Sequence, residues 1–193
     1  MIEQILFLAG FAAAITLTVL MALSSFKKNY RFWPPSEGNF CWLTYWILAG
    51  INVSSLVLLT NLNFLSLSEF NLQILVGLLI GTIGTLITFI AILKLGINTS
   101  SGLTDELIDS GPYSFSRNPQ VVGNLLMLLG LTVLLPRPNI VSLALITAVW
   151  LFLMIFTEEK WLEEEYGEDY RNYKSDVPRF INISKIESPL KKK

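Results

Sequence analysis

Two short polar segments contain the residues of this chain that could do chemistry. The first, residues 105–119, lies between two largely apolar stretches. Within it, Gly111-Pro112 is typical of a turn, and Asn118-Pro119 is typical of the N-cap and first residue of a helix. A loop that ends at a helix N-terminus offers free amide donors, which suit a carboxylate or a phosphate. On these features alone, an ordinary connecting loop is the simpler interpretation.

The second segment begins at Glu158, where a long uncharged stretch ends. Glu158, Leu162 and Tyr166 recur every four residues, so they share one face of a helix. Carboxylates at the edge of a bilayer are costly unless they are paired or used in function. Because Arg117 precedes a neighbouring apolar stretch on the same side of the membrane, we expect it to pair with Glu158 or Glu159.

The residues after this face predict a helix end and a second short helix. Gly167 suits a helix C-terminus. We expect the next helix to carry Tyr170 and Tyr173 and to end at Val177-Pro178.

Composition indicates an integral membrane protein. Of the 193 residues, 52% are hydrophobic and 15% are charged, whereas soluble domains are usually about 25% charged. The chain has no histidine, which excludes Ser-His-Asp catalysis and the commonest general base. Its single cysteine, Cys41, excludes a disulfide framework and a thiolate zinc site, so we expect no metal.

Uncharged stretches predict an all-α, polytopic bundle of about five transmembrane helices. A helix needs roughly 20 apolar residues to cross a bilayer, and lipid demands internally satisfied backbone groups. The five stretches are residues 4–26, 38–68, 70–93, 118–136 and 138–157. The last two are separated only by Pro136-Arg137-Pro138, which predicts a tight antiparallel hairpin.

We divide the chain into two predicted parts. Residues 1–69 form two N-terminal transmembrane helices, and residues 70–193 form a core of three helices, the loop 96–118 and the tail 158–193. Lysine and arginine concentrate on the side that carries the tail, so the N-terminus is expected outside and the tail in the cytoplasm. The first stretch follows Glu3 and is interpreted as a full span and not a cleaved signal peptide.

Small residues in the third stretch predict close helix packing. Gly77 and Gly81 lie four residues apart, so they share a helix face that lets another helix approach closely. Packing within one chain explains this pattern, and a homodimer seam through Gly77 and Gly81 is the alternative.

The two polar segments contain spaced motifs. They read Gly111-Pro112-Tyr113-x-x-x-Arg117-Asn118-Pro119-x-x-x-Gly123 and Glu158-Glu159-x-x-Leu162-x-x-x-Tyr166-Gly167-x-x-Tyr170-x-x-Tyr173-x-x-x-Val177-Pro178. In spacing, order and position relative to the last two apolar stretches, they resemble the signatures of the isoprenylcysteine carboxyl methyltransferase and phospholipid methyltransferase superfamily. The resemblance covers roughly residues 70–182.

This resemblance implies an integral-membrane enzyme that uses S-adenosylmethionine, with its cofactor site in the cytoplasmic loop and tail. Its implied acceptor is lipophilic: a lipid amine, a lipid or prenylcysteine carboxylate, or a small hydrophobic molecule from the bilayer. No nucleic acid partner is implied. The implied catalytic residues are Arg117, which would orient the acceptor or brace Glu158, and Glu159, which with Tyr113 is a candidate proton acceptor. The implied cofactor-binding residues are Asp105, Glu106, Leu107, Ile108, Gly111, Tyr113, Asn118, Pro119, Gln120, Val121 and Glu158.

Four positions depart from the superfamily pattern. Asp105 and Asn118 stand where the family has histidines, and Val121 stands where it has a tyrosine. Met154 replaces a substrate-binding arginine, which favours a neutral, apolar or amine-bearing acceptor over a prenylcysteine carboxylate. Two alternatives remain: a sterol-type membrane reductase that uses NADPH, and a non-catalytic membrane scaffold whose site has eroded.

Overall fold

The computed structural model describes residues 1–27, 30–35, 40–64, 71–96, 99 and 107–181. Within these ranges the regular secondary structure is entirely helical, because an apolar stretch in lipid must satisfy its backbone hydrogen bonds internally. The predicted all-α class is confirmed. The elements are α1 (Ile2–Phe26), α2 (Phe40–Phe64), α3 (Leu72–Leu95), η1 (Gly111–Ser114), α5 (Pro119–Leu134) and α6 (Pro138–Asp176).

Four of these helices, α1, α2, α3 and α6, are long and apolar enough to cross a membrane. Helix α5 is also apolar but has only 16 residues, a length of about 24 Å at 1.5 Å per residue. Pro119 opens α5, and a connection rich in proline follows it. The described residues therefore contain five α-helices, as predicted, but four of them are long enough to span, because the predicted span 118–136 is the shorter helix α5.

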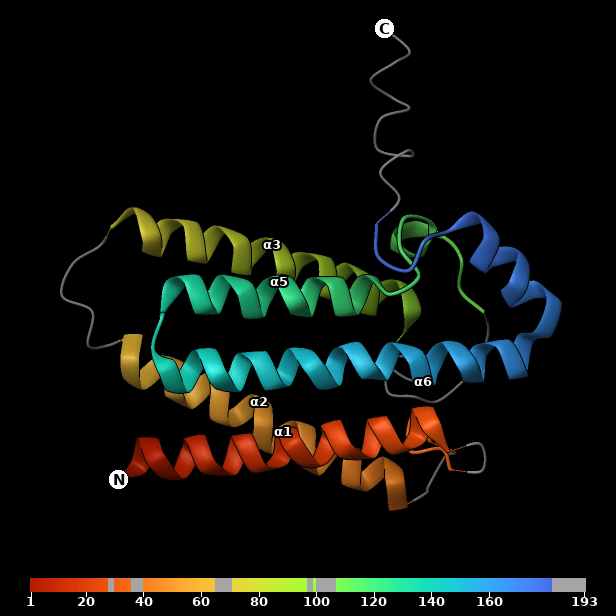
Figure 1. Cartoon of the computed structure of the whole chain (residues 1–193). Coiled ribbons are helices and arrows are strands. Elements are labelled where there is room, and N and C mark those ends of the chain that lie inside the picture. Colours follow the sequence, from red (N-terminus) through yellow and green to blue (C-terminus); the bar gives the residue numbers. More distant parts are fainter. Residues whose placement is uncertain (28–29, 36–39, 65–70, 97–98, 100–106, 182–193) are drawn as a thin grey trace, which may run out of the picture.

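Successive helices run in alternating directions (Figure 1). Helix α3 packs along α5, α1 packs along α2 and α6, and α5 lies against α6. The carboxyl ends of α1 and α3 and the amino ends of α2 and α5 therefore meet at one end of the bundle, here named the η1 end (Figure 1). Helix α6 continues beyond the bundle at this end, and the chain's N-terminus lies at the opposite end.

Glycines bring α3 and α5 into backbone contact. A Cβ added to Gly84 would collide with the backbone of Gly123 and Met127, and one added to Gly130 would collide with the backbone of Gly81 and Gly77. Such close approach increases van der Waals contact, which drives helix association where no hydrophobic effect operates. Packing within one chain is therefore the alternative that the structure supports.

The face of Gly77 is not available for the alternative homodimer seam. A Cβ added to Gly77 would overlap the backbone of Leu134 in α5, so this face is already filled within the chain. Gly81 differs, because a Cβ added to it would meet nothing within 4 Å.

The outer part of α6 bends at Gly167. This residue has φ 52° and ψ −118°, a backbone conformation that glycine adopts without a Cβ clash. The bend turns the last residues of α6 back toward η1 (Figure 1), where Tyr170, Tyr173 and Val177 form a small buried cluster. The predicted break at Gly167 and the helix that carries the two tyrosines are confirmed.

The close contact between α3 and α5 predicts that a larger residue in this contact destabilises the fold. We expect Gly130→Ala to lower the free energy of unfolding by about 1–3 kcal/mol, because its methyl group would force the two backbones apart. The control is Gly50→Ala in α2, where a Cβ meets nothing within 4 Å and alanine should stabilise the helix slightly. Thermal unfolding in detergent measures both variants. Equal melting temperatures would contradict the packing described.

Candidate functional site

A narrow pocket lies at the η1 end, between the amino end of α5 and the middle of α6. Its cavity volume is about 80 Å³. Aromatic, aliphatic and charged side chains line it together: Pro34, Leu95, Thr99, Leu107, Ile108, Tyr113, Arg117, Asn118, Gln120, Val121, Met154, Glu158, Trp161, Leu162, Tyr166 and Tyr173. We name this hollow the polar pocket.

The polar pocket brings together most of the residues that the sequence singled out. Those that line it are Leu107, Ile108, Tyr113, Arg117, Asn118, Gln120, Val121 and Glu158. Gly111 and Pro119 lie in the same segment without lining it, and Glu159 lies on the other side of α6. Asp105 and Glu106 lie outside the described residues.

The Gly111-Pro112-Tyr113 turn is a single 3₁₀ turn that presents Tyr113 to the pocket. Gly111 has φ 63°, a left-handed conformation that favours glycine. The hydroxyl of Tyr173 donates a hydrogen bond of 2.7 Å to the carbonyl of Tyr113. This bond joins the turn to the bent end of α6, which is sixty residues away in sequence.

Beside the pocket, Glu159 is the centre of a buried ion cluster. Arg117 Nη1 lies 3.1 Å from Glu159 Oε1, and the two side chains are only 8% and 7% exposed. Arg179 donates two hydrogen bonds to the same carboxylate, Nε to Oε1 at 3.0 Å and Nη2 to Oε2 at 2.7 Å. Arg117 Nη1 also donates to the hydroxyl of Tyr170 at 3.1 Å. The expected pairing of Arg117 with one of the two glutamates is thus found at Glu159.

Asn118 takes part in this cluster and does not cap α5 with its side chain. It occupies the predicted N-cap position, but its side chain makes no capping hydrogen bond. Its Nδ2 instead donates to Glu159 Oε1 at 3.4 Å and to the Arg179 carbonyl at 3.2 Å. The backbone N–H of Arg117 donates to the Pro178 carbonyl at 3.1 Å. The loop before α5 is therefore held by the chain that follows α6.

Glu158 has a different environment, although it is the next residue. Its half-buried side chain lines the polar pocket and forms no ion pair with any described residue. It lies just beyond the uncharged stretch of α6. The pKa of the Glu158 carboxyl is raised to about 7, mainly by burial; a hydrogen bond with Trp33 opposes this increase, and the neighbouring Glu159 carboxylate adds to it. Near neutral pH, Glu158 can therefore exist in either protonation state.

Tyr113 faces Glu158 across the pocket region but is not suited to accept a proton. Burial raises the pKa of its phenol above the usual range, and the Glu158 carboxylate adds to this increase. The hydroxyl therefore stays protonated and neutral at physiological pH, where it can donate a hydrogen bond.

Sequence reasoning missed Arg179 and Trp161. Arg179 makes the two-pronged contact with Glu159 and also lies over the ring of Phe156, 4.7 Å from its centroid. The only available signal was its position directly after Val177-Pro178, which ends α6. Trp161 lines the pocket because it lies three residues after Glu158 on the same helix face.

The architecture and the site together define a class: a polytopic helical membrane protein with a partly polar pocket at one end of the bundle. Within this class, the sequence model of the phospholipid methyltransferase family matches residues 72–169, just over half of the chain. The chain belongs to this family of membrane methyltransferases. The match covers α3, η1, α5 and most of α6. Neither a search of curated proteins nor a search of solved structures found a match.

The ion cluster makes a prediction about stability. We expect Glu159→Gln to lower the free energy of unfolding by about 3–5 kcal/mol, because it leaves two buried or half-buried guanidinium groups without their carboxylate. The matched control is Glu163→Gln. This change breaks an exposed pair with Lys174 at 3.0 Å, which is worth about 0–1 kcal/mol.

Thermal or denaturant unfolding of both variants in detergent measures the difference. If Glu159→Gln were no more destabilising than Glu163→Gln, the cluster would not hold the η1 end together.

Proposed function

We propose that this protein transfers a methyl group from S-adenosylmethionine to a lipophilic acceptor that reaches the polar pocket from the bilayer. The observation that carries the proposal is the Glu158 carboxylate, which has no ion-pair partner among the described residues and lies in a pocket lined by aromatic rings. Membership of a methyltransferase family supports the reaction type and favours it over the reductase alternative.

The residues of the pocket fit the charges of this cofactor. Its sulfonium and ammonium groups are cations, and Glu158 supplies a carboxylate beside the rings of Tyr113, Trp161 and Tyr166, which attract cations through their faces. Its carboxylate is an anion, and the buried Nε–H of Arg117 has no hydrogen-bond partner in the described part of the chain. When bound, the cofactor supplies a methyl group on a positively charged sulfur.

Binding requires the pocket to widen. A cavity of about 80 Å³ is smaller than the roughly 300–1,000 Å³ of usual small-molecule sites. Glu158, Leu162 and Tyr166 all line the pocket from α6. A rotamer change of a ring such as Tyr166 is the kind of movement that would make room, because this residue precedes the bend at Gly167.

We assign different roles to the two glutamates. Glu158 faces the pocket and holds the cationic part of the cofactor. Glu159 is already engaged by Arg117 and Arg179, so we assign it to positioning: it fixes the Arg117 side chain. An amine acceptor must release a proton, and Glu158, whose pKa burial raises to about 7, is the better candidate to receive it.

We propose that the η1 end faces the cytoplasm. Lys27 follows α1, Lys94 lies in the last turn of α3, and Arg117 precedes α5, so all three lie at this end (Figure 1). An excess of basic residues near membrane ends marks the cytoplasmic side.

Binding of the cofactor is the direct test. Calorimetry on the detergent-purified protein should detect S-adenosylmethionine and S-adenosylhomocysteine. We expect Glu158→Gln to weaken binding of S-adenosylmethionine at least tenfold, about 1.4 kcal/mol, because a neutral amide cannot pair with its cations. Glu164→Gln, an exposed glutamate on the same helix, is the control and should bind normally. Binding of NADPH alone would favour the reductase, and no binding of any of these ligands would favour the scaffold.

The raised pKa of Glu158 predicts a pH dependence of binding. A carboxyl with a pKa of about 7 is mostly neutral at pH 5.5 and mostly charged at pH 7.5, so affinity for the cation should rise with pH over this range, by up to about tenfold. Glu158→Gln should abolish the rise. An identical pH profile for this variant and the wild type would assign the dependence to another group.

A further inference from the structure

A short segment from the N-terminal part of the chain contributes to the wall of the polar pocket. It comprises residues 30–35, which lie between α1 and α2, and is here named the Trp33 segment. Its residue Pro34 lines the pocket, although the family model matches only residues 72–169. The matched region alone therefore does not complete the pocket of this protein.

Aromatic side chains hold the Trp33 segment in the core. Phe32 and Trp33 are only 2% and 4% exposed. They belong to one buried cluster with Val121 and Met154, which both line the polar pocket. The backbone N–H of Phe32 also donates a hydrogen bond of 3.0 Å to the hydroxyl of Ser24, near the end of α1. These contacts fix the indole of Trp33 beside the pocket.

Helix α2 supports the same indole through Tyr45. The rings of Trp33 and Tyr45 have centroids 4.1 Å apart, with their planes tilted by 35°. The hydroxyl of Tyr45 donates to the sulfur of Met154 on α6 at 3.6 Å. Movement of the Trp33 indole would therefore disturb contacts that join α2 to α6.

The polar edge of this indole interacts with Glu158. The interaction lowers the pKa of the Glu158 carboxyl against the larger effect of burial, because a hydrogen-bond donor stabilises the charged form of its acceptor. The hydrogen bond is incomplete: among the described residues, the buried Nε1–H of Trp33 meets no acceptor at full hydrogen-bonding geometry. An indole N–H donates and does not accept, so it favours the carboxylate over the neutral acid.

The titratable and charged groups around Glu158 come from several elements of the described chain. They are Tyr45 from α2, Tyr113 from η1, Arg117 from the loop before α5, and Glu159, Tyr166, Tyr170 and Tyr173 from α6. The hydroxyl of Tyr173 donates to a backbone carbonyl, and Arg117 pairs with Glu159. Because Trp33 is neutral, its replacement removes a donor from Glu158 and leaves all of these groups in place.

We infer that Trp33 is a positioning residue, whose indole N–H orients the Glu158 carboxylate in the polar pocket and favours its charged form. A carboxylate is a stronger acceptor than a neutral acid, so loss of the Glu158 proton strengthens the contact with the indole. That the charged Glu158 then holds the cationic part of S-adenosylmethionine rests on the proposed function. Residues outside the region that the family model matches thereby take part in binding the cofactor.

The first test needs no cofactor. Infrared titration of the full-length protein in detergent follows the protonated-carboxyl band that Glu158→Gln removes. We expect Trp33→Phe to raise the pH midpoint of this band by about 0.5–1 unit, a part of what a full hydrogen bond to a charged group supplies. The reason is that a phenyl ring has no donor for the carboxylate.

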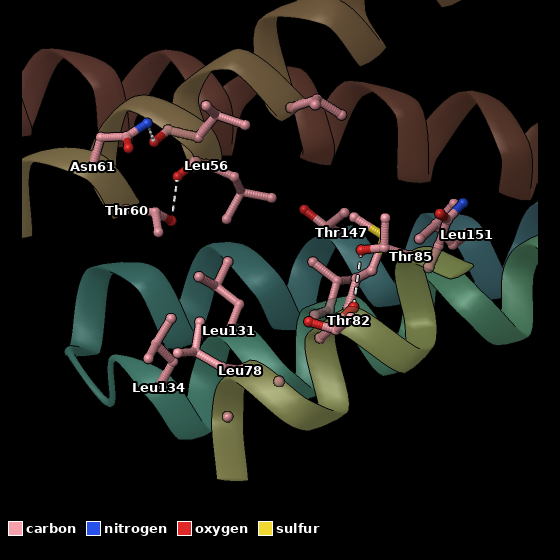
Figure 2. Close-up of a pocket in the computed structure, with 18 of the residues that line it drawn as sticks. Leu56, Thr60, Asn61, Leu78, Thr82, Thr85, Leu131, Leu134, Thr147 and Leu151 are labelled. Carbon is pink, nitrogen blue, oxygen red and sulfur yellow. Dashed lines mark hydrogen bonds between the residues drawn. The ribbon is translucent and has the colours of Figure 1, made fainter. Parts of the chain in front are cut away.

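The matched control is Trp150→Phe, the same substitution at another buried indole. Trp150 is 3% exposed, its Nε1–H has no hydrogen-bond partner among the described residues, and its ring lies 6.1 Å from that of Tyr45. It lines a different cavity, of about 570 Å³, which Figure 2 shows among α2, α3, α5 and α6. Its pH midpoint should match the wild type. Equal shifts in the two variants, or no shift in Trp33→Phe, would overturn the inference.

A second substitution separates the donor from the packing of the ring. Trp33→benzothienylalanine, introduced by codon suppression, keeps the fused rings and has sulfur in place of the N–H. It should raise the pH midpoint as Trp33→Phe does, and it decides the question if Trp33→Phe does not fold. A wild-type midpoint in this variant would assign any effect of Trp33→Phe to packing and would overturn the inference.

Calorimetry with S-adenosylmethionine measures the consequence for binding. Trp33→Phe should weaken binding about two- to fivefold at pH 7 and much less at pH 8.5, where the Glu158 carboxyl is mostly charged in both proteins. Trp150→Phe should bind as the wild type does at both pH values. An equal loss of affinity at pH 7 and pH 8.5 in Trp33→Phe would indicate a purely structural role and would overturn the inference.

The two measurements separate this inference from the proposed function. If the pH midpoint shifts as expected but no cofactor binds to the wild type, the action of Trp33 on Glu158 stands and the proposed function fails. If the cofactor binds and the midpoint does not shift, the role of Trp33 is wrong and the methyltransferase proposal stands.

Discussion

The carboxylate of Glu159 joins three parts of the chain that are far apart in sequence. It pairs with Arg117 from the loop before α5 and with Arg179 from the segment after α6, while Glu159 itself lies in α6 before the bend at Gly167. A buried carboxylate is costly unless it is fully paired, so only an arrangement that delivers both guanidinium groups is stable. This requirement fixes the Arg117 side chain and brings the Pro178 carbonyl to the Arg117 N–H. Contacts outside the polar pocket therefore determine the shape of the wall that Arg117 forms.

Glu158 and Glu159, which are adjacent in α6, therefore lie in different environments. Consecutive residues on a helix point about 100° apart, so Glu159 faces the arginines and Glu158 faces the pocket. Glu159 forms two ion pairs, whereas Glu158 forms none with any described residue, and burial raises the pKa of Glu158 to about 7. Two neighbouring carboxyl groups in different environments can have different pKa values. Proteins commonly use such a pair to divide a structural role and a chemical role between the two groups. This division supports the assignment of Glu158 to the ligand and of Glu159 to positioning.

Sequence patterns predicted the elements better than the contacts between them. The helix starting at Pro119, the bend at Gly167 and the shared face of Glu158, Leu162 and Tyr166 all follow from local rules, and the structure has them. The choice of Glu159 over Glu158 as the partner of Arg117 depends on helix rotation, which spacing alone does not define. Arg179 was missed because its contact spans twenty residues across the bend. The N-cap position of Asn118 predicts that its side chain caps α5. The side chain donates instead to the buried carboxylate of Glu159, which is a stronger, charged acceptor.

The position of each cavity along the bundle indicates how its lining residues relate to the membrane. Charged groups collect at the η1 end, where Lys94, Arg117 and Glu158 lie near the ends of the apolar stretches. A larger cavity of about 570 Å³ lies further along α5 and α6, and the buried indole Nε1–H of Trp150, one of its lining residues, has no hydrogen-bond partner among the described residues. Methyl transfer needs alignment of donor and acceptor more than proton relay, so the absence of histidine does not conflict with the proposed reaction.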